Sequence, residues 1–433
     1  MKKLILFTIL AMVIFAALTK TIQYGLSLSL FNPQHSFWKY QCIDTMKVSR
    51  DEARSLPGSS KLAAEVDFQV ATIKSLGANC IAIGTPYDEE FIPYLKFWVR
   101  KARQNNVHVW FRGNWSSWEG WFDHKKDLTP QKHIELTRQF ILSHPDLFEN
   151  GDIFTPAPEA ENAWPNGSAG NDKDAFRQFL IKEYQVSQNA FDQIGKNVET
   201  NWLSMSGGVA KNVLDQNTVD AIGDTVTLDH YVTDPEDMAN YINYFKNNYH
   251  ANVVIGEFGA PIPDLNGDMD ENQQAAFVEK LLHELYVNRA SIHAINYWTL
   301  TDSSTSIYSS STHQPRKVAQ VIKSYFIPAI IKGRITNPLG DPVIDVTIAT
   351  TDNGSSTKTD GNGNYTIVVP AKDVTINIKQ KNQPSITQTF AIAHSGEIKQ
   401  DIIVEPTEKD FVYQLRWMIK EFGNKIKSMF VKK

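Results

Sequence analysis

Residues 251–259 read Ala-Asn-Val-Val-Ile-Gly-Glu-Phe-Gly, an apolar and largely β-branched run that delivers one carboxylate, Glu257, and ends at Gly259. A run of this kind is typical of a strand that is buried on both faces of a parallel sheet. The carboxyl end of such a strand lies at the edge where parallel α/β folds carry their chemistry. Glu257 is therefore the first candidate for a catalytic residue.

Two other segments repeat this arrangement. Residues 151–162 contain a short apolar run that ends in the acids Glu159 and Glu161, and residues 292–298 contain a run that ends in Trp298. Hydrolysis of a glycosidic bond uses two carboxyl groups, and an aromatic ring suits the apolar face of a sugar. The three segments together indicate chemistry on sugars.

Short apolar runs alternate with longer amphipathic stretches from about residue 38 to residue 326, which is typical of βα units on a parallel sheet. Eight strands are expected to end near Asp44, Gly84, Arg112, Pro158, Met205, His230, Glu257 and Trp298. Helices are expected over residues 61–76, 89–104, 131–142, 174–194, 235–249, 271–288 and 315–325. Eight such units predict a closed (β/α)8 TIM barrel at residues 36–328. The sequence has no GxGxxG motif after a predicted strand, which counts against a dinucleotide-binding fold.

The pattern changes after residue 328 to short alternating segments between turns rich in Gly, Asn, Asp and Pro. Strands are expected over residues 331–335, 343–350, 365–369, 374–379, 387–391 and 398–404. Period-two alternation with these turns predicts a small all-β sandwich of the transthyretin or immunoglobulin type at residues 329–406.

Both ends of the chain carry segments that point to a membrane. Two lysines precede an apolar run from Leu4 to Leu18, so residues 1–22 are expected to be a signal peptide or an uncleaved N-terminal membrane anchor. Residues 409–433 are expected to form a basic amphipathic helix, which suits a membrane surface or docking against the protein's own domains. We therefore expect an exported protein that is held at the membrane or cell surface, or alternatively secreted.

The composition excludes several classes of protein. The net charge is −5, and no basic patch interleaved with aromatic residues occurs in the globular part, so no nucleic-acid partner is expected. The eleven histidines are scattered and no CxxC or HExxH spacing occurs, so neither a metal nor a cofactor is expected.

The two cysteines, Cys42 and Cys80, lie in the apolar runs of the first and second expected strands. Two cysteines do not make a disulfide framework. Buried free thiols are the expected state, and a single bridge between neighbouring strands is the alternative.

On these residues the chain resembles the clan A glycoside hydrolases, which are retaining enzymes on (β/α)8 barrels. The resemblance spans residues 38–326 and rests on Glu159 after the fourth strand, on Ile-Gly-Glu-Phe-Gly at residues 255–259 and on Trp298 after the eighth strand. It implies that Glu159 is the acid/base, that Glu257 is the nucleophile and that Trp298 forms a sugar platform. The implied substrate is a β-linked polysaccharide or oligosaccharide.

The chain departs from the clan pattern at two positions. Pro158 precedes the acid where the clan usually has Asn, and His230 and Tyr231 are adjacent where the clan commonly separates these residue types by one position. Two alternatives to a hydrolase therefore stay open, a catalytically inactive carbohydrate-binding barrel and a structural cell-surface protein.

The expected substrate-binding residues besides Trp298 are Arg112, Asn114, Trp115, Glu161, His230 and Tyr231. Arg112 is expected to hold the charge of the nucleophile, or to form a structural salt bridge, and Asn114 to bond a sugar hydroxyl. His230 and Tyr231 are expected to orient or bond the nucleophile, with a core position as the alternative for His230. About half of the cluster Trp110, Trp115, Trp118 and Trp121 is expected to be buried.

Residues 333–346 and 359–367 resemble the carboxypeptidase regulatory-like domain, a transthyretin-type sandwich. The resemblance covers about 75 residues of the second domain and includes the segment Thr-Asp-Gly-Asn-Gly-Asn-Tyr at residues 359–365. It implies a spacer, a stabilising module or a weak glycan binder rather than a catalytic domain.

Overall fold

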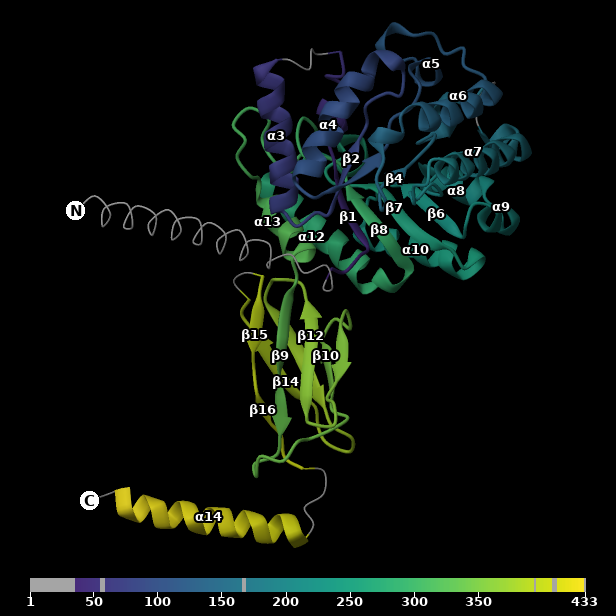
Figure 1. Cartoon of the computed structure of the whole chain (residues 1–433). Coiled ribbons are helices and arrows are strands. Elements are labelled where there is room, and N and C mark those ends of the chain that lie inside the picture. Colours follow the sequence, from purple (N-terminus) through teal and green to yellow (C-terminus); the bar gives the residue numbers. More distant parts are fainter. Residues whose placement is uncertain (1–35, 55–58, 166–168, 393–394, 407–410, 432–433) are drawn as a thin grey trace, which may run out of the picture. The chain divides into compact units, whose positions relative to one another are not determined.

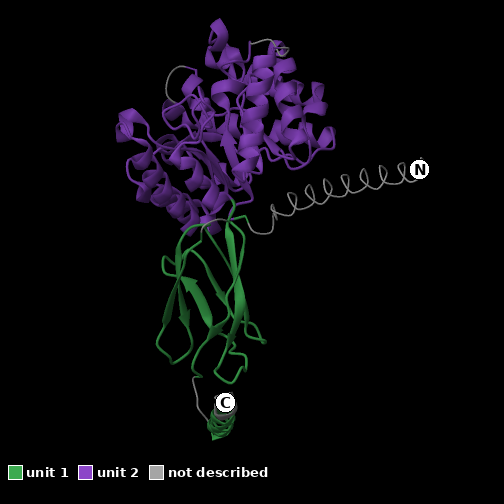
Figure 2. Cartoon of the chain, turned by 90° about the vertical axis from the view of Figure 1, so that its left-hand side faces the viewer, with its two compact units in different colours: residues 1–36, 327–433 green, residues 37–326 purple. Residues whose placement is uncertain are grey.

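The computed structural model describes residues 36–54, 59–165, 169–392, 395–406 and 411–431. They form two compact units, one spanning Phe37–Phe326 and one containing Ile327–Lys433 (Figures 1 and 2). The boundary falls where the sequence pattern changes from βα units to short alternating strands. The expected signal peptide or anchor at residues 1–22 lies outside the described residues.

Eight parallel strands form the sheet of the first unit, in the order β4-β3-β2-β1-β8-β7-β6-β5. They are β1 (Tyr40–Asp44), β2 (Cys80–Ile83), β3 (His108–Phe111), β4 (Ile153–Phe154), β5 (Ser204–Ser206), β6 (Thr225–Asp229), β7 (Asn252–Phe258) and β8 (Ile292–Tyr297). A parallel bridge between Ile153 and Glu199, on the chain leading into β5, joins the two ends of this order. The predicted (β/α)8 barrel is confirmed.

Helices connect the strands and cover the outside of the barrel (Figure 1). They are α2 (Met46–Ser49), α3 (Ser60–Ser75), α4 (Ile92–Gln104), α5 (Ser116–Glu119), α6 (Pro130–Ser143), α7 (Lys173–Gln193), α8 (Gly207–Val213), α9 (Gln216–Ala221), α10 (Pro235–Tyr249), α11 (Pro263–Asn266), α12 (Glu271–Val287) and α13 (Lys317–Phe326). Local signals start several of them. Asp270 and Gln273 form a capping box at α12, for example.

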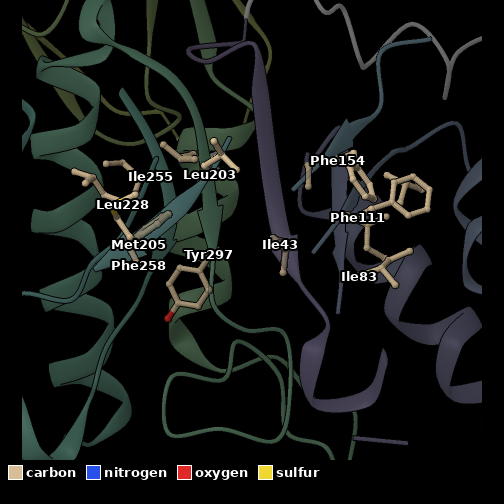
Figure 3. Packing of buried hydrophobic residues seen from close by; sticks show 14 of the residues in the cluster. Ile43, Ile83, Phe111, Phe154, Leu203, Met205, Leu228, Ile255, Phe258 and Tyr297 are labelled. Carbon is tan, nitrogen blue, oxygen red and sulfur yellow. The ribbon is translucent and has the colours of Figure 1, made fainter. Parts of the chain in front are cut away.

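Alternation along the strands divides their side chains between two cores. Ile43, Phe111 and Leu228 belong to the large cluster in which strands pack against helices (Figure 3). Their neighbours on the same strands point the other way, and Cys42 and Trp110 belong to a separate small cluster inside the barrel. The next inward position on each strand, two residues further along, therefore reaches the carboxyl end of the barrel interior.

The expectation of two free thiols is wrong, because Cys42 and Cys80 form a disulfide. The two residues are direct partners in the parallel register of β1 and β2, and both face the barrel interior. Sequence spacing does not reveal which residues of neighbouring strands stand opposite each other, so the alternative single bridge could not be favoured from the sequence.

The second unit contains two four-stranded sheets, in the orders β11-β10-β13-β14 and β12-β9-β15, with β16 also beside β9. The first sheet is antiparallel, and in the second β15 and β16 pair with β9 in parallel. The strands are β9 (Ala329–Thr336), β10 (Thr347–Thr350), β11 (Ser356–Lys358), β12 (Asn364–Val369), β13 (Val374–Lys379), β14 (Ile386–Phe390), β15 (Glu397–Lys399) and β16 (Ile402–Ile403). Ile331, Ile348 and Ile376 are fully buried in its core. The predicted sandwich is confirmed, although β11 was missed because its three residues include no apolar side chain.

The helix α14 (Phe411–Val431) follows the sandwich, as the amphipathic pattern predicts. Its apolar side chains between Phe411 and Ile426 are exposed, with 75% of Phe411 and 68% of Phe422 open to solvent. Arg416 pairs with Asp341 of the sandwich through two hydrogen bonds of 2.9 Å. In the part of the chain that the structure covers, no helix combines the length and apolar character needed to cross a bilayer.

Candidate active site

A polar layer closes the barrel interior at the carboxyl ends of the strands. Its members are Asp44 on β1, Arg112 after β3, Asp229 on β6, Glu257 on β7 and Asn296 on β8. Each is buried, and Arg112 is only 1% exposed. A charged layer at this depth requires internal partners, because unpaired charges are too costly to bury.

Arg112 supplies these partners by bonding three carboxylates at once. One of its terminal nitrogens donates to Asp44 at 3.1 Å and to Glu257 at 2.9 Å. The other donates to Asp229 at 2.7 Å. The prediction that Arg112 holds the charge of Glu257 agrees with this geometry, and the guanidinium also ties four strands of the barrel together.

Glu257 receives a second donor on its other oxygen. The hydroxyl of Tyr231 donates to Oε2 at 2.8 Å, while Arg112 donates to Oε1. Two donors fix the carboxylate and stabilise its negative charge. The residue before it must be glycine, because a Cβ on Gly256 would lie 2.2 Å from Oδ1 of Asp229.

One guanidinium does not neutralise three buried carboxyl groups. Burial raises the pKa of Asp229, although the Arg112 charge lowers it in part and the charge of Glu257 raises it further. The pKa of Asp44 is raised by burial in the same way, against the opposing charge of Arg112. Burial and mutual repulsion therefore oppose the ionisation of all three carboxyl groups, and Arg112 counteracts this effect.

We expect Arg112→Met to destabilise the barrel by about 3–5 kcal/mol at neutral pH, because it leaves buried carboxylates without a cation. Loss of the guanidinium raises the pKa of Asp44 and Asp229 further. In the unfolded chain these carboxyl groups lose their protons above about pH 4. The loss of stability caused by the substitution should therefore grow from about pH 5 to about pH 8. Chemical denaturation of both proteins at these two pH values measures it. A loss of equal size at both would show that packing, not charge, dominates.

A cavity of about 190 Å³ opens above this layer. Its walls are formed by Met46, Arg50, Arg112, Glu119, Trp121, Pro158, Glu159, Asn162, Glu257 and Trp298. A larger depression of about 510 Å³ lies at the opposite ends of the strands, beside Asn150 and Glu199, and holds none of the predicted site residues. The smaller cavity is the candidate active site, because the two predicted catalytic carboxyl groups and the predicted aromatic platform meet there.

Glu159 is placed in the cavity wall by an unusual backbone conformation. Its φ and ψ are both 45°, in the left-handed region that residues with a side chain rarely adopt. Its N–H donates to the carbonyl of Ser204 at 3.0 Å, and Nδ2 of Asn162 donates to its carboxyl group at 3.1 Å. Strained conformations of this kind are concentrated at functional sites.

The environment of Glu159 favours the protonated acid. Burial raises its pKa to about 9, with further increases from the negative charges of Glu257, Asp229 and Glu161, against the lowering effect of Arg112. Glu257, in contrast, is held by two donors. The two carboxyl groups thus face one cavity in opposite settings, which is the usual basis for dividing acid and nucleophile roles.

Glu161 is not a cavity residue. One of its oxygens accepts a hydrogen bond of 2.8 Å from the N–H of Ser206, at the end of β5. Burial raises its pKa to about 7, and the Ser206 N–H lowers it in part. Glu161 therefore ties the loop after β4 to the next strand. This predicted substrate-binding residue does not line the cavity.

The structure also keeps Asn114 and Trp115 out of the cavity. Asn114 is fully buried, and its side chain bonds Glu119, His133 and the N–H of Trp115. The ring of Trp115 is buried against Tyr87. These two residues lie three and four positions beyond the end of β3, just before α5, and their side chains turn into the packed loop.

His230 and Trp298 were both predicted as site residues, but only Trp298 lines the cavity. Only the backbone N–H of His230 contacts Glu257, by donating to its carbonyl at 3.0 Å. The ring lies against Tyr241, with centroids 3.9 Å apart, and burial lowers its pKa to about 4. Trp298 does line the cavity and stands edge-on to Tyr231. Of the clustered tryptophans, only Trp121 reaches the cavity.

Sequence reasoning missed several residues of this site. Asp44 and Asp229 each close an apolar strand, which is the signal that identified Glu257, but no role was assigned to them. Asn162 and Glu119 lie in short helical turns after β4 and β3 and carry no comparable signal. Across the ranges that the structure describes, no three or more His, Cys, Asp or Glu side chains are placed to hold a metal ion.

Comparison with solved structures agrees with the barrel. A fungal beta-1,4-galactanase matches with a TM-score of 0.50 and 13% identity over 66% of this chain and 99% of its own. Other solved structures that are similar to this chain include further glycoside hydrolases. They include a broad-specificity endoglucanase from Clostridium acetobutylicum (TM-score 0.47, 14% identity, 69% of this chain, 98% of its own). A beta-glycosidase has the same TM-score of 0.47, with 12% identity over 68% of this chain and 97% of its own.

No family model and no curated protein matches the chain. At 13% identity the likeness to the galactanase shows the fold of the barrel alone, and the reaction is argued from the site. The likeness of the second unit to the carboxypeptidase regulatory-like domain stays a prediction.

Proposed function

We propose that the chain is a retaining glycoside hydrolase that cleaves a β-linked polysaccharide or oligosaccharide. One observation carries the proposal. Glu159 and Glu257 line the same small cavity at the carboxyl ends of β4 and β7, one protonated by its surroundings and the other held by two donors. That pairing is what a double displacement at a sugar carbon requires.

In the proposed mechanism, Glu257 attacks the anomeric carbon while Glu159 gives its proton to the leaving oxygen. The glycosidic bond breaks and a covalent glycosyl–Glu257 ester forms. Glu159, now ionised, takes a proton from water, and the resulting hydroxide attacks the same carbon and releases Glu257. Arg112 and Tyr231 accommodate the change of charge on Glu257 through their hydrogen bonds.

The inactive carbohydrate-binding barrel is the second candidate, and Pro158 before Glu159 is the feature that favours it. Asn162 counts against it, because this residue brings an amide into the cavity and onto Glu159. A purely structural protein would have no use for a cavity that combines two carboxyl groups with Trp121 and Trp298. Incubation with β-glucans, mannans, galactans and xylans tests the reaction, and the anomer released first, followed by NMR, tests retention.

We further propose that the protein is exported and attached to the membrane. The apolar run at residues 4–18 supports export. Residues 411–433 carry six Lys or Arg and one acid, and α14 exposes Phe411, Ile419 and Phe422. A basic helix with an exposed apolar face suits an anionic lipid surface.

The attachment is expected to depend mainly on the N-terminal segment. An uncleaved anchor resists high salt, whereas one amphipathic helix gives only reversible binding. The intact protein should therefore sediment with membranes in high salt, and a chain that begins at Ser36 should be released by it. The intact mass of the native protein decides between the two attachments. A mature N-terminus between residues 19 and 25 would leave α14 as the attachment.

A further inference from the structure

Glu119 is a third carboxyl group in the wall of the candidate active site. It ends helix α5, and with Trp121 two residues later it presents a carboxyl group and an indole ring to the same cavity. Burial raises its pKa to about 7, while Asn114, Lys126 and Arg50 lower it. The proposed displacement reaction uses Glu159 and Glu257 and leaves Glu119 without a role.

A buried chain of hydrogen bonds leads from Glu119 into the barrel wall. Nδ2 of Asn114 donates to Oε1 of Glu119 at 2.6 Å. Oδ1 of Asn114 accepts from the N–H of Trp115 at 2.8 Å, which fixes the orientation of the amide. Nε2 of His133 lies 2.9 Å from the same oxygen and therefore donates to it. Nδ1 of His133 lies 2.6 Å from Oε1 of Glu183.

Burying this series of hydrogen-bonded side chains costs free energy of folding. Asn114, His133 and Glu183 are all fully buried, and each polar side chain taken from water must recover its lost hydration through hydrogen bonds. Apolar side chains of similar shape would fill the same space at little or no cost. These hydrogen bonds end at the carboxylate of Glu119, where Asn114 donates to one of the two oxygens. Their effect is to fix a hydrogen-bond acceptor in the cavity wall.

We propose that Glu119 binds hydroxyl groups of the substrate, and that Asn114, His133 and Glu183 hold its carboxylate in position for this. The inference rests on the proposed function of the cavity. In the proposed binding mode, the ring of Trp121 packs on the apolar face of the same sugar unit. Asn114 thus acts on the substrate through Glu119, and not by the direct contact expected from the sequence.

The charges of the cavity select a neutral sugar. Arg112 is occupied by three carboxylates, and Arg50 donates to Asp51 at 2.9 Å and lies 5.0 Å from the ring of Trp121. Arg112, the buried guanidinium of the cavity, is therefore not open to an acidic sugar. Carboxylates at Glu119 and Glu257 repel an acidic sugar and accept from hydroxyl groups.

Binding is tested with four β-1,4-linked tetrasaccharides, of glucose, mannose, galactose and xylose, followed by quenching of tryptophan fluorescence. In Glu119→Gln the side-chain oxygen can still accept from Asn114, while the other end becomes a donor. The dissociation constant of the preferred sugar should rise about 10- to 100-fold, which is the range for hydrogen bonds to a charged group. Glu135→Gln, the same change at an exposed position on α6, should leave it unaltered.

A double-mutant cycle separates positioning from simple loss of structure. Asn114→Ser should weaken binding in the wild-type background and add little in the Glu119→Gln background, because both changes remove the same acceptor. Additive effects would show that Asn114 acts independently of Glu119. Thermal unfolding of each variant identifies any that lose the fold.

The outcomes distinguish this inference from the proposed reaction. Turnover with wild-type affinity in Glu119→Gln overturns the role of Glu119 and leaves the hydrolase standing. Tight binding that depends on Glu119 without any turnover removes the hydrolase and keeps the sugar-binding role. Failure of the wild-type protein to bind all four tetrasaccharides contradicts both.

Discussion

Glu257→Gln is expected to leave the barrel folded and to lower turnover by several orders of magnitude. The amide cannot attack the anomeric carbon as a carboxylate does, so the covalent route is closed. The fold should survive because the Gln oxygen can accept from Arg112, and the hydroxyl of Tyr231 can accept from the new amide instead of donating. Arg112 keeps its bonds to Asp44 and Asp229.

Initial rates on the best substrate of the polysaccharide panel measure this effect, and far-ultraviolet circular dichroism and thermal unfolding check the fold. Glu284→Gln on α12 is the matched control, because it makes the same change in a helix on the outside of the barrel. Near wild-type turnover in Glu257→Gln would exclude this residue as the nucleophile.

Glu159→Ala is expected to lower turnover by about 10²- to 10⁴-fold on natural sugars, whose leaving groups need a proton. Aryl glycosides with good leaving groups need little protonation, so formation of the covalent intermediate on these substrates should be nearly spared. The wild-type rate should fall as the pH rises through about 9, because the raised pKa keeps Glu159 protonated below that value. The variant should lack this alkaline decline.

Steady-state and pre-steady-state rates on aryl glycosides with a range of leaving groups measure this dependence. Glu161→Ala is the comparison, since Glu161 is also partly buried and follows the same strand but bonds Ser206 outside the cavity. If Glu161→Ala shows the leaving-group dependence and Glu159→Ala does not, the assignment of the acid is wrong by two residues.

Strand and helix positions could be predicted from the sequence because they depend on local periodicity. All eight barrel strands and seven of the helices around them were identified from apolar runs and amphipathic stretches, and α10 begins and ends where it was predicted. The short helices α8 and α9, which separate β5 from β6, were not predicted. β11 could not be found, because Ser356–Lys358 has no apolar residue to mark a buried face. The sandwich and α14 followed from equally local patterns.

Candidate catalytic residues were found where local sequence also fixed their place in the barrel. Glu257 closes an apolar strand, and the carboxyl end of every strand in a (β/α)8 barrel faces the same opening. Arg112 and Trp298 are at strand ends as well and reach the site. Asn114 and Trp115 were misplaced because the chain has already turned into the loop before α5, where packing decides the direction of each side chain.

The sequence by itself determined the element order, the two-unit organisation and the strand ends from which the candidate site is built. Only the tertiary structure decided the contacts across strands: the disulfide between Cys42 and Cys80, the three carboxylates on Arg112 and the chain that ends on Glu119. The disulfide and the Arg112 contacts depend on the register between strands, and the hydrogen bonds that lead to Glu119 depend on how α6 and α7 pack against the loop after β3. That register is set by closure of the barrel and packing of its interior, which no local pattern records.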